Sequence, residues 1–259
     1  MGYILITGAC GGLGKVFCRE LIKTDDLFLT GRSLTRLNEL KAELCAVNPN
    51  AKVIVFQADL TSEKERENLF SFADENGITF SGYFAVAGAD IQKAFLKYTP
   101  EKIVFQTRLN FEANIAVCRE VLVRREKDLK ILCVSSMSGS TPMPYFAIYS
   151  ATKSALINFY TSLRYEVKDA KITILAPGGI PTREDVKRDI QIQGWTGRMS
   201  SKPAEFVVKK ALKALDKNKR LVIPGAFNKF VYGLEKLVPL SVKCRFVAKK
   251  WKGKEKDAF

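Results

Sequence analysis

Short apolar runs alternate with longer stretches of helical periodicity along most of the chain. The runs that resemble buried strands lie near residues 3–7, 27–30, 53–57, 82–86, 130–134, 171–175 and 221–223. Apolar residues recur at helical spacing over 13–23, 34–47, 62–75, 100–126, 147–168 and 203–217. This alternation predicts an α/β fold, a doubly wound parallel sheet (Rossmann fold) with helices on both faces. Ligands of such a sheet bind at the carboxyl ends of its strands.

The sequence shows no boundary between separate domains. Its 259 residues contain no linker rich in proline, glycine or serine, no low-complexity tract and no obvious repeat. Folds of the α/β class often reach this size as one domain. We expect one domain over 1–225 with a lid at 183–202, and a basic amphipathic extension of the same domain over 226–259.

Cysteine and histidine usage bears on compartment and metal binding. The six cysteines are scattered without CxxC pairs, and the chain has no histidine. We therefore expect reduced, mostly buried thiols and no metal site. The chain enters the strand-like run 3–7 directly, without the pattern of a signal peptide. These features predict a cytoplasmic protein.

A glycine-rich turn, TGACGGLG over 7–14, joins the first expected strand to the first expected helix. Glycines let a backbone approach a pyrophosphate, and a helix N-terminus supplies amide donors and a positive dipole end. The alternative is a plain tight turn, although three spaced glycines exceed what a turn requires. In this strand-to-helix context we expect a dinucleotide to contact Gly8, Cys10, Gly12, Leu13 and Gly14.

The second strand is followed by Arg32, where proteins that bind NAD usually place an acidic residue. An arginine suits the 2′-phosphate of NADP, so we expect NADP(H) as the cofactor; a solvated surface cation is the alternative. Asp59, after the third strand, is placed to accept a hydrogen bond from the adenine amino group. It also precedes a capping sequence, in which Thr61 or Ser62 starts a helix with Glu65 in reach, and the two roles are compatible.

A tyrosine and a lysine stand one helical turn apart in the run YSATK, from Tyr149 to Lys153. Because the chain has no histidine, an enzyme of this sequence needs another proton donor at neutral pH. A neighbouring ammonium favours the phenolate and lowers a tyrosine pKa from its reference of about 10. We therefore expect Tyr149 to give or take a proton near neutral pH.

These motifs together resemble the short-chain dehydrogenase/reductase family over about the first 225 residues. The resemblance rests on the order and spacing of the glycine-rich turn, Asp59-Leu60, Asn110, Ser136, the YxxxK run and PGGIPT over 177–182. It implies an oxidoreductase that interconverts a carbonyl and a secondary or primary alcohol. The hydride comes from the cofactor and the proton from the tyrosine, and the fold fixes both against one carbonyl.

The resemblance also implies roles for single residues. Tyr149 is the general acid of carbonyl reduction and the base of alcohol oxidation, and Lys153 lowers its pKa and holds the nicotinamide ribose. Ser136 binds the substrate oxygen, while Asn110 supports a water-linked proton path to the lysine. Their structural alternatives are a core aromatic, a solvated cation, a turn former and an amide that bonds the backbone. Besides Tyr149 and Lys153, the implied cofactor contacts are Leu60, Ala87, Gly88, Pro177, Gly178, Ile180 and Thr182.

One departure from the family pattern follows the fourth strand. The family usually has Asn-Asn-Ala-Gly there, and this chain has Ala85-Val86-Ala87-Gly88. We expect the apolar replacements to repack against their neighbours and to leave the proton and hydride chemistry intact. The departure also motivates a second hypothesis, an NADP-binding regulatory or membrane-associated protein that no longer turns over.

Segment 183–202, which we expect to be polar and irregular, lies where the family's substrate lid grows. Its Trp195 and Met199 are candidates for an apolar substrate wall. The alternative is that both residues anchor the loop to the core.

The C-terminal extension is strongly basic. Residues 229–256 hold nine lysines or arginines and two glutamates, a net charge of +7, with apolar residues at helical spacing on both sides of Pro239. The extension either packs on the body, covers the substrate cleft or forms an oligomer contact, or it binds anionic lipid. We favour packing for 226–238 and contact with lipid or another anionic partner for 241–256.

The net charge of +15 indicates an acidic partner. A phosphorylated cofactor and an anionic membrane surface both fit, whereas no nucleic-acid recognition motif accompanies the charge. We expect an NADPH-dependent reductase of a ketone or aldehyde on an apolar or acyl-chain substrate. We also expect a cytoplasmic homodimer or tetramer, built through helices 100–126 and 147–168, that is at most peripheral at a membrane. A protein whose basic tail itself binds membrane or nucleic acid is a third reading.

Overall fold

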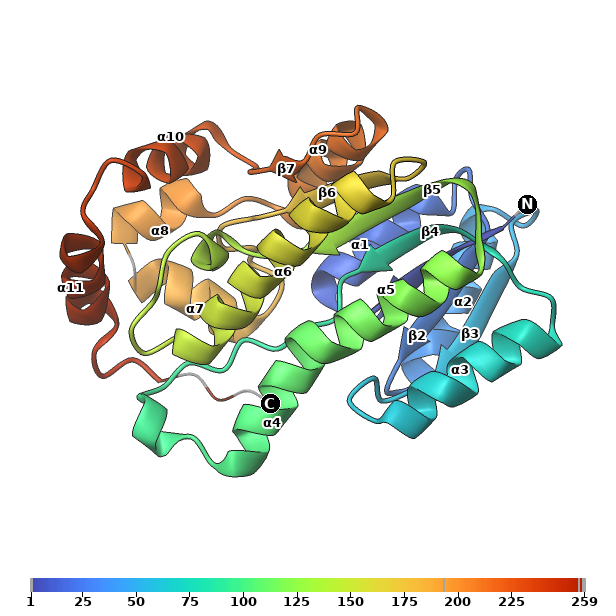
Figure 1. Cartoon of the computed structure of the whole chain (residues 1–259), viewed down its shortest axis with the longest axis horizontal. Coiled ribbons are helices and arrows are strands. Elements are labelled where there is room, and N and C mark those ends of the chain that lie inside the picture. The colour runs from blue at the N-terminus through green and yellow to red at the C-terminus, as the bar shows by residue number, and fades with distance from the viewer. Residues whose placement is uncertain (1, 193, 256, 258–259) are drawn as a thin grey trace.

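The computed structural model describes residues 2–192, 194–255 and 257, and shows a seven-stranded sheet flanked by helices (Figure 1). The strand order is β3-β2-β1-β4-β5-β6-β7, and every described strand pair is parallel. The order reverses between β1 and β4, and sheets of this kind bind ligands at the carboxyl ends of the strands at such a reversal. This confirms the predicted doubly wound sheet. The strands are β1 (Tyr3–Thr7), β2 (Leu27–Gly31), β3 (Val53–Gln57), β4 (Phe80–Ala85), β5 (Arg125–Val134), β6 (Lys171–Leu175) and β7 (Leu221–Val222).

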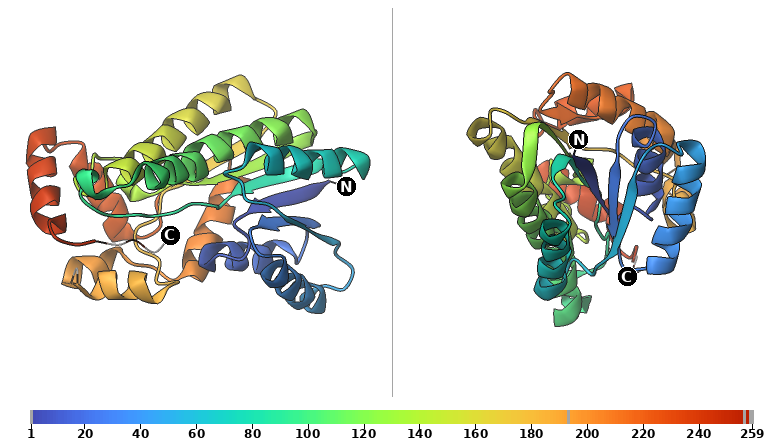
Figure 2. Two further views of the ribbon diagram at one scale, coloured as in Figure 1. Left: turned by 90° about the horizontal axis from the view of Figure 1, so that it is seen from below. Right: turned by 90° about the vertical axis from the view of Figure 1, so that its right-hand side faces the viewer.

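Helices cover both faces of the sheet, as the end-on view shows (Figure 2, right). The hydrophobic core consists of two clusters, one on each face of the sheet, because successive side chains of a strand point to opposite faces. Leu5 and Tyr83 belong to one cluster, and their neighbours Ile6 and Phe84 belong to the other. One layer contains α3 (Glu63–Glu75), α5 (Ala113–Val123) and α6 (Ala147–Glu166). The opposite layer contains α1 (Gly12–Leu21), α2 (Leu34–Val47) and α9 (Ala204–Asp216).

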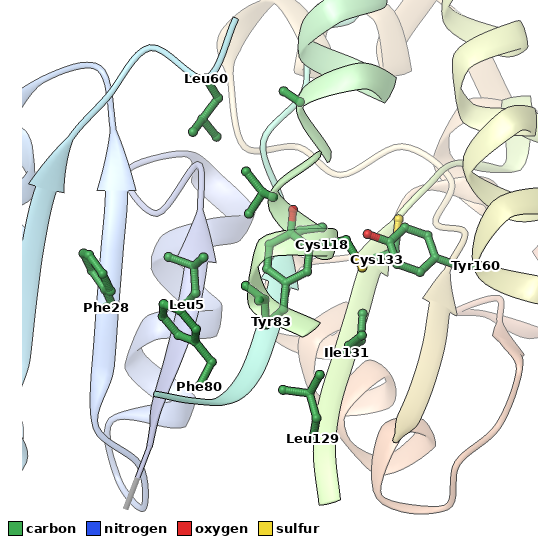
Figure 3. Packing of buried hydrophobic residues seen from close by; sticks show 14 of the residues in the cluster. Leu5, Phe28, Leu60, Phe80, Tyr83, Cys118, Leu129, Ile131, Cys133 and Tyr160 are labelled. Atoms are coloured by element: carbon green, nitrogen blue, oxygen red, sulfur yellow. The ribbon is translucent and has the colours of Figure 1, made fainter. Parts of the chain in front are cut away.

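Two fully buried tyrosines, Tyr83 and Tyr160, lie inside the first cluster (Figure 3). They share one polar partner, Asn114. The hydroxyl of Tyr160 donates to Oδ1 of Asn114 over 2.5 Å, and that of Tyr83 donates to its backbone oxygen over 3.2 Å. A buried hydroxyl needs such a partner. The asparagine therefore lets large aromatic side chains fill the core beneath α6.

The predicted helix over 100–126 is divided in the structure. It consists of α4 (Pro100–Thr107), a π-helical turn (Arg108–Glu112) and α5, and it ends at Val123. The residues after Arg124 instead begin β5, where Arg125 pairs with Phe80. The expected helix was too long and the expected strand too short, because this register with β4 overrides the local helical pattern.

The prediction that 183–202 is irregular was wrong. The segment forms α7 (Glu184–Ile192) and α8 (Gly194–Ser200). Apolar residues at helical spacing are few in this segment, because most of its described residues face solvent. Ile190 is one residue that turns inward, since a Cβ built on Gly179 would lie 3.4 Å from its side chain.

The C-terminal extension forms the two helices that its apolar spacing predicts, α10 (Ala226–Glu235) and α11 (Leu240–Trp251), separated at Pro239. They stand at the end of the molecule away from the N-terminus, and the chain then turns back toward α4 (Figures 1 and 2). The remaining elements are short 3₁₀ turns at Phe95–Lys97 and Met137–Gly139. Within the part of the chain that the structure describes, no helix is long and apolar enough to cross a membrane, and no cluster of side chains could hold a metal ion.

Candidate active site

The glycine-rich turn lies at the carboxyl end of β1 and leads into α1. Gly8 has a φ of +66°, and a Cβ there would lie 2.8 Å from the Cα of Ala87. A Cβ on Gly14 would lie 2.2 Å from the carbonyl oxygen of Gly8. Glycine is therefore required at both positions, and the turn stays close to the end of β4.

The turn presents backbone rather than side chains to the crevice. Helix α1 begins at Gly12 after an exposed Gly11, and no side chain caps its first amides. Cys10 and Leu13 pack their side chains against the core. An exposed helix N-terminus in a turn without acidic residues fits the pyrophosphate of a dinucleotide.

Two arginines border the turn at the end of β2. Arg32 is exposed, and the guanidinium of Arg36 donates to the carbonyl oxygen of Cys10 over 2.9 Å. Arg36 is held in the first turn of α2, where its amide donates to the hydroxyl of Ser33. The sequence interpretation missed Arg36. The only feature of the sequence that could have indicated its place beside the turn is its position three residues after the helix cap Ser33. The two cations give this side of the turn the charge that a 2′-phosphate would need.

Asp59 caps the loop before α3. Its Oδ1 accepts from the amide and hydroxyl of Thr61 at 2.9 and 2.8 Å. Ser62 is the helix cap and accepts from the amide of Glu65, whose carboxylate turns to the amide of Asp59. The capping role is thus present, although Glu65 bonds Asp59 rather than the cap residue. Leu60 is buried in the core, and an adenine contact at Asp59-Leu60 stays a prediction.

The chain departs from the family pattern at the end of β4 without leaving a gap. Ala85 is fully buried in one core cluster, and Val86 packs against the other. The apolar replacements therefore repack as predicted. A Cβ on Gly88 would lie 3.2 Å from Oδ1 of Asn110 and 3.3 Å from Nζ of Lys153, so this glycine lets both side chains approach the loop.

Ser136 and Tyr149 form the centre of the site. Ser136 follows β5, Tyr149 lies in the first turn of α6, and the hydroxyl of Ser136 lies near enough to the phenol to lower its pKa. The ring of Tyr149 stacks on Phe146 with centroids 4.3 Å apart. The neighbouring hydroxyl of Ser135 instead donates to the backbone oxygen of Lys153 over 2.8 Å, which is a structural role.

Lys153 and Asn110 lie behind this pair. The ammonium of Lys153 is buried, donates to the carbonyl oxygen of Val134 over 2.8 Å, and lies 5.7 Å from the ring centroid of Tyr149. Asn110 occupies the π-helical turn, a feature frequent at functional sites. Its side-chain oxygen accepts a hydrogen bond from the backbone amide of Ala89 at 2.7 Å, and its side-chain amide donates one to the backbone carbonyl oxygen of Ala89 at 2.9 Å. Asn110 therefore holds the loop after β4 beside the lysine.

The expectation that the ammonium lowers the pKa of Tyr149 was wrong. Burial raises the pKa of the phenol above its ordinary value, and the negative charge of Asp90 raises it further. The hydrogen bond from Ser136 and the charge of Arg183 oppose this shift. Burial also lowers the pKa of the Lys153 ammonium. Desolvation outweighs the favourable charges because Lys153 is buried and Tyr149 is partly withdrawn from water.

Asp90 and Arg183 are site residues that the sequence interpretation missed. They form an ion pair of 2.9 Å between the loop after β4 and the start of segment 183–202. Arg183 directly follows PGGIPT, but a pairing across 93 residues leaves no local pattern. The side-chain amide of Gln106 supports the same loop by donating to the carbonyl oxygens of Ala89 and Ile91.

The loop after β6 holds the other predicted cofactor residues, Pro177, Gly178, Ile180 and Thr182. Its first carbonyl, at Pro177, accepts from the amide of Met137 at 3.0 Å. At its other end, a Cβ on Gly12 would lie 2.3 Å from the side chain of Thr182. The loop therefore runs from the serine side of the site to the glycine-rich turn.

The extension borders the site on the side of segment 183–202. Trp195 of α8 makes an edge contact with Phe227 of α10, with centroids 5.7 Å apart. The carboxylate of Glu235 accepts from the hydroxyl of Ser140 at 2.9 Å, close to Ser136 in the chain. Trp195 thus anchors α8 to the extension rather than to the sheet core, and the role of Met199 in a substrate wall stays a prediction.

Comparisons with known proteins identify the family and the fold. The family model for short chain dehydrogenase matches residues 2–191. A PIGF/3-ketodihydrosphingosine reductase fusion protein from Schizosaccharomyces pombe is 30% identical over 189 residues, which make up 69% of this chain but only 37% of that protein. A 3-ketodihydrosphingosine reductase from Bacteroides thetaiotaomicron is 26% identical over 221 residues, 84% of this chain and 77% of that protein.

A solved structure confirms the fold. YwfH, an NADPH dependent reductase involved in bacilysin biosynthesis, matches with a TM-score of 0.76 at 15% identity, over 88% of this chain and 98% of that chain. Since the family model covers most of the sequence and the motif residues meet at one edge of the sheet, this protein belongs to the short-chain dehydrogenase/reductase family and is an oxidoreductase that binds a nicotinamide cofactor.

Proposed function

We propose that this protein reduces a ketone or aldehyde to the alcohol with NADPH, and that Tyr149 donates the proton. The observation that carries the proposal is that Ser136, Tyr149 and Lys153 come together, with the serine hydroxyl near the phenol and the lysine one helical turn away. When bound, the reduced cofactor supplies the hydride. The residues of the chain then have to orient the carbonyl and move one proton.

The raised pKa of Tyr149 supports the direction of reduction. At neutral pH the phenol keeps its proton and is ready to act as an acid. As a hydride adds to the carbonyl carbon, the carbonyl oxygen becomes an alkoxide, which is a far stronger base than a phenolate, so proton transfer from the phenol to this oxygen stays favourable. Ser136 is placed to donate to the same oxygen and to fix it next to the phenol. Oxidation of an alcohol needs the phenolate instead, and its fraction grows as the pH rises toward the pKa.

Lys153 and Asn110 complete the proposed machinery. The buried ammonium of Lys153 lies beside Gly88, in reach of a ribose placed between the glycine-rich turn and the loop 177–182. Asn110 keeps the loop at Ala89 in place through two hydrogen bonds. In this proposal the lysine holds the nicotinamide ribose, and the asparagine supports the path that returns a proton to the site.

Preference for NADP(H) is supported by the charge at the end of β2. Arg32 is exposed there, Arg36 bonds the turn at Cys10, and no acidic residue takes the place that a ribose diol would need. Guanidinium groups bind phosphate oxygens with charge-assisted bonds. We propose that Arg32 and Arg36 together hold the 2′-phosphate.

The substrate is proposed to be a ketone or aldehyde on an apolar or acyl chain. Two relatives carry the name of a reductase of 3-ketodihydrosphingosine, which is a ketone. In this chain the aromatic contact between Trp195 and Phe227 supplies apolar surface on the lid side of the site. We also propose a homodimer or tetramer through α4–α5 and α6, where Val104, Val123 and Tyr165 are exposed.

A screen of carbonyl compounds for oxidation of NADPH tests the proposal. We expect turnover that is faster with NADPH than with NADH and that improves as the apolar part of a ketone lengthens. Calorimetry of NADPH binding accompanies the screen. Tight binding of NADPH without turnover of any ketone or aldehyde would contradict the proposal and favour the regulatory alternative.

A further inference from the structure

The inner face of α10 is tied to the body of the protein. The buried side-chain amide of Asn228 donates to the carbonyl oxygens of Ser200 and Pro224 at 2.9 and 2.8 Å. Phe227 meets Trp195, and Glu235 accepts from Ser140 at the far end of the helix. These contacts fix which side of α10 faces the body and which side faces out.

The outer face of the two terminal helices is apolar. Phe230 on α10 and Leu237 in the turn after it are 67% and 82% exposed, and Leu234 lies between them at helical spacing. On α11 Phe246 is 68% exposed, with Val242 one turn before it. Large apolar side chains are rarely exposed as a group unless they bind a partner. This set, the outer apolar face, consists of Phe230, Leu234, Leu237, Leu240, Val242 and Phe246.

Cations lie on the same outward side. Arg245, Lys249 and Lys252 are exposed and follow one another at spacings of four and three residues, next to Phe246 on α11. Lys229 and Lys236 are exposed beside the apolar stripe of α10. Apolar and basic residues thus share one face, the arrangement of a helix that lies in the headgroup region of a membrane.

The acidic residues of the extension all bond or pair with the body of the protein. Glu235 is the only acid between 226 and 252, and its carboxylate bonds Ser140 and Thr141. Beyond α11, Glu255 pairs with Lys97, and Asp257 pairs with Lys93 and Lys102. The carboxylates hold the extension to the body, and positive charge is left facing outward.

We propose that the outer apolar face of α10 and α11, with its flanking cations, docks the protein onto the surface of an anionic lipid bilayer. The helices lie on such a surface rather than cross it, which agrees with their length and charge. A second copy of this chain fits less well, because a two-fold contact would bring the same cations against one another. The prediction that only 241–256 contacts lipid is thereby extended to the outer side of α10.

Flotation of the full-length protein with vesicles of phosphatidylcholine containing about 30% phosphatidylserine tests this proposal. We expect binding that falls as salt is raised and that is much weaker with phosphatidylcholine alone. The readout needs neither cofactor nor turnover, so its outcome is independent of the proposed reductase activity.

Two sets of variants separate the apolar and the electrostatic contributions. The triple variant Phe230→Ser/Leu237→Ser/Phe246→Ser is expected to lose more than about tenfold in affinity. Its matched control replaces exposed apolar residues elsewhere, Leu34→Ser/Val47→Ser/Phe206→Ser, and is expected to bind like the wild type.

The charge variant Arg245→Gln/Lys249→Gln/Lys252→Gln is expected to lose about a hundredfold, at about fivefold per cation. Its control removes three exposed cations around α9, Lys209→Gln/Lys213→Gln/Lys217→Gln. Three results would overturn the proposal: no binding to anionic vesicles at low salt, equal losses in the matched variants and their controls, or an oligomer that the apolar triple variant dissociates while lipid binding is unchanged.

Discussion

Arg183 donates to Asp90 over 2.9 Å, and this ion pair joins two segments that border Tyr149. Asp90 belongs to the loop after β4 that Asn110 holds in place, and Arg183 begins segment 183–202. The two charges act on the phenol in opposite directions, since Asp90 raises its pKa and Arg183 lowers it. The pair therefore links the position of segment 183–202 to the protonation state of the proposed acid.

Removing the negative charge is expected to shift the pH dependence of the reaction. With Asp90→Asn the pKa of Tyr149 falls, so alcohol oxidation, which needs the phenolate, begins to rise at lower pH. Carbonyl reduction needs the phenol, and its decline at high pH moves to lower pH as well. Arg183→Gln is expected to raise the pKa of Tyr149, so that the rise of oxidation and the decline of reduction both move to higher pH.

Profiles of kcat/KM against pH in both directions check this prediction. The charged groups that face the phenol are Lys153, Asp90 and Arg183, and only the last two are changed. Glu166→Gln, an exposed acid at the end of the same helix α6, is the control and is expected to leave the profile unchanged. Superimposable profiles for the wild type and Asp90→Asn would argue against the electrostatic link.

Cofactor preference is expected to depend on Arg32. Arg32→Asp removes a cation from the proposed 2′-phosphate site and supplies an acid for a ribose diol. Loss of a hydrogen bond to a charged group costs about 1.5–3 kcal/mol, so NADPH binding is expected to weaken by roughly 10- to 100-fold while NADH binding improves. Titration of both cofactors measures the change, and an unaltered ratio of the two affinities would place the 2′-phosphate elsewhere.

The glycine-rich turn offers a test of packing. In Gly14→Ala the added Cβ would lie 2.2 Å from the backbone oxygen of Gly8, so we expect a loss of about 1–3 kcal/mol in stability and weaker cofactor binding. Gly233→Ala in α10 is the matched control, because no atom lies within 4 Å of its Cβ. Alanine is the better helix former, so this variant is expected to be neutral or slightly stabilising. Thermal unfolding of both variants decides between these outcomes.

The local pattern of apolar and polar residues was sufficient to predict most of the fold. The period of the apolar positions predicted all seven strands, and the order of the motifs placed Ser136 and Tyr149 in one site. The pattern failed where tertiary pairing decides the outcome. Register with β4 turns the residues after Arg124 into strand, and the mostly solvent-facing residues of 183–202 form helices although few of them are apolar.

The electrostatics of the site could not be predicted from spacing alone. Lys153 stands one turn from Tyr149, as the YxxxK run requires, but its ammonium bonds Val134 and is withdrawn from water. Burial of the phenol and the approach of Asp90 depend on segments far apart in sequence. A helical spacing gives the distance between two side chains, whereas the pKa depends on everything that surrounds them.

The most direct test of the central claim is the rate of NADPH-dependent ketone reduction by Tyr149→Phe, measured beside NADPH binding. The variant keeps the ring that stacks on Phe146 but lacks the proton, so we expect turnover to fall by at least about 100-fold with cofactor affinity within about twofold of the wild type. Tyr165→Phe, an exposed tyrosine on the same helix, is expected to retain full activity. Full activity in Tyr149→Phe would contradict the account.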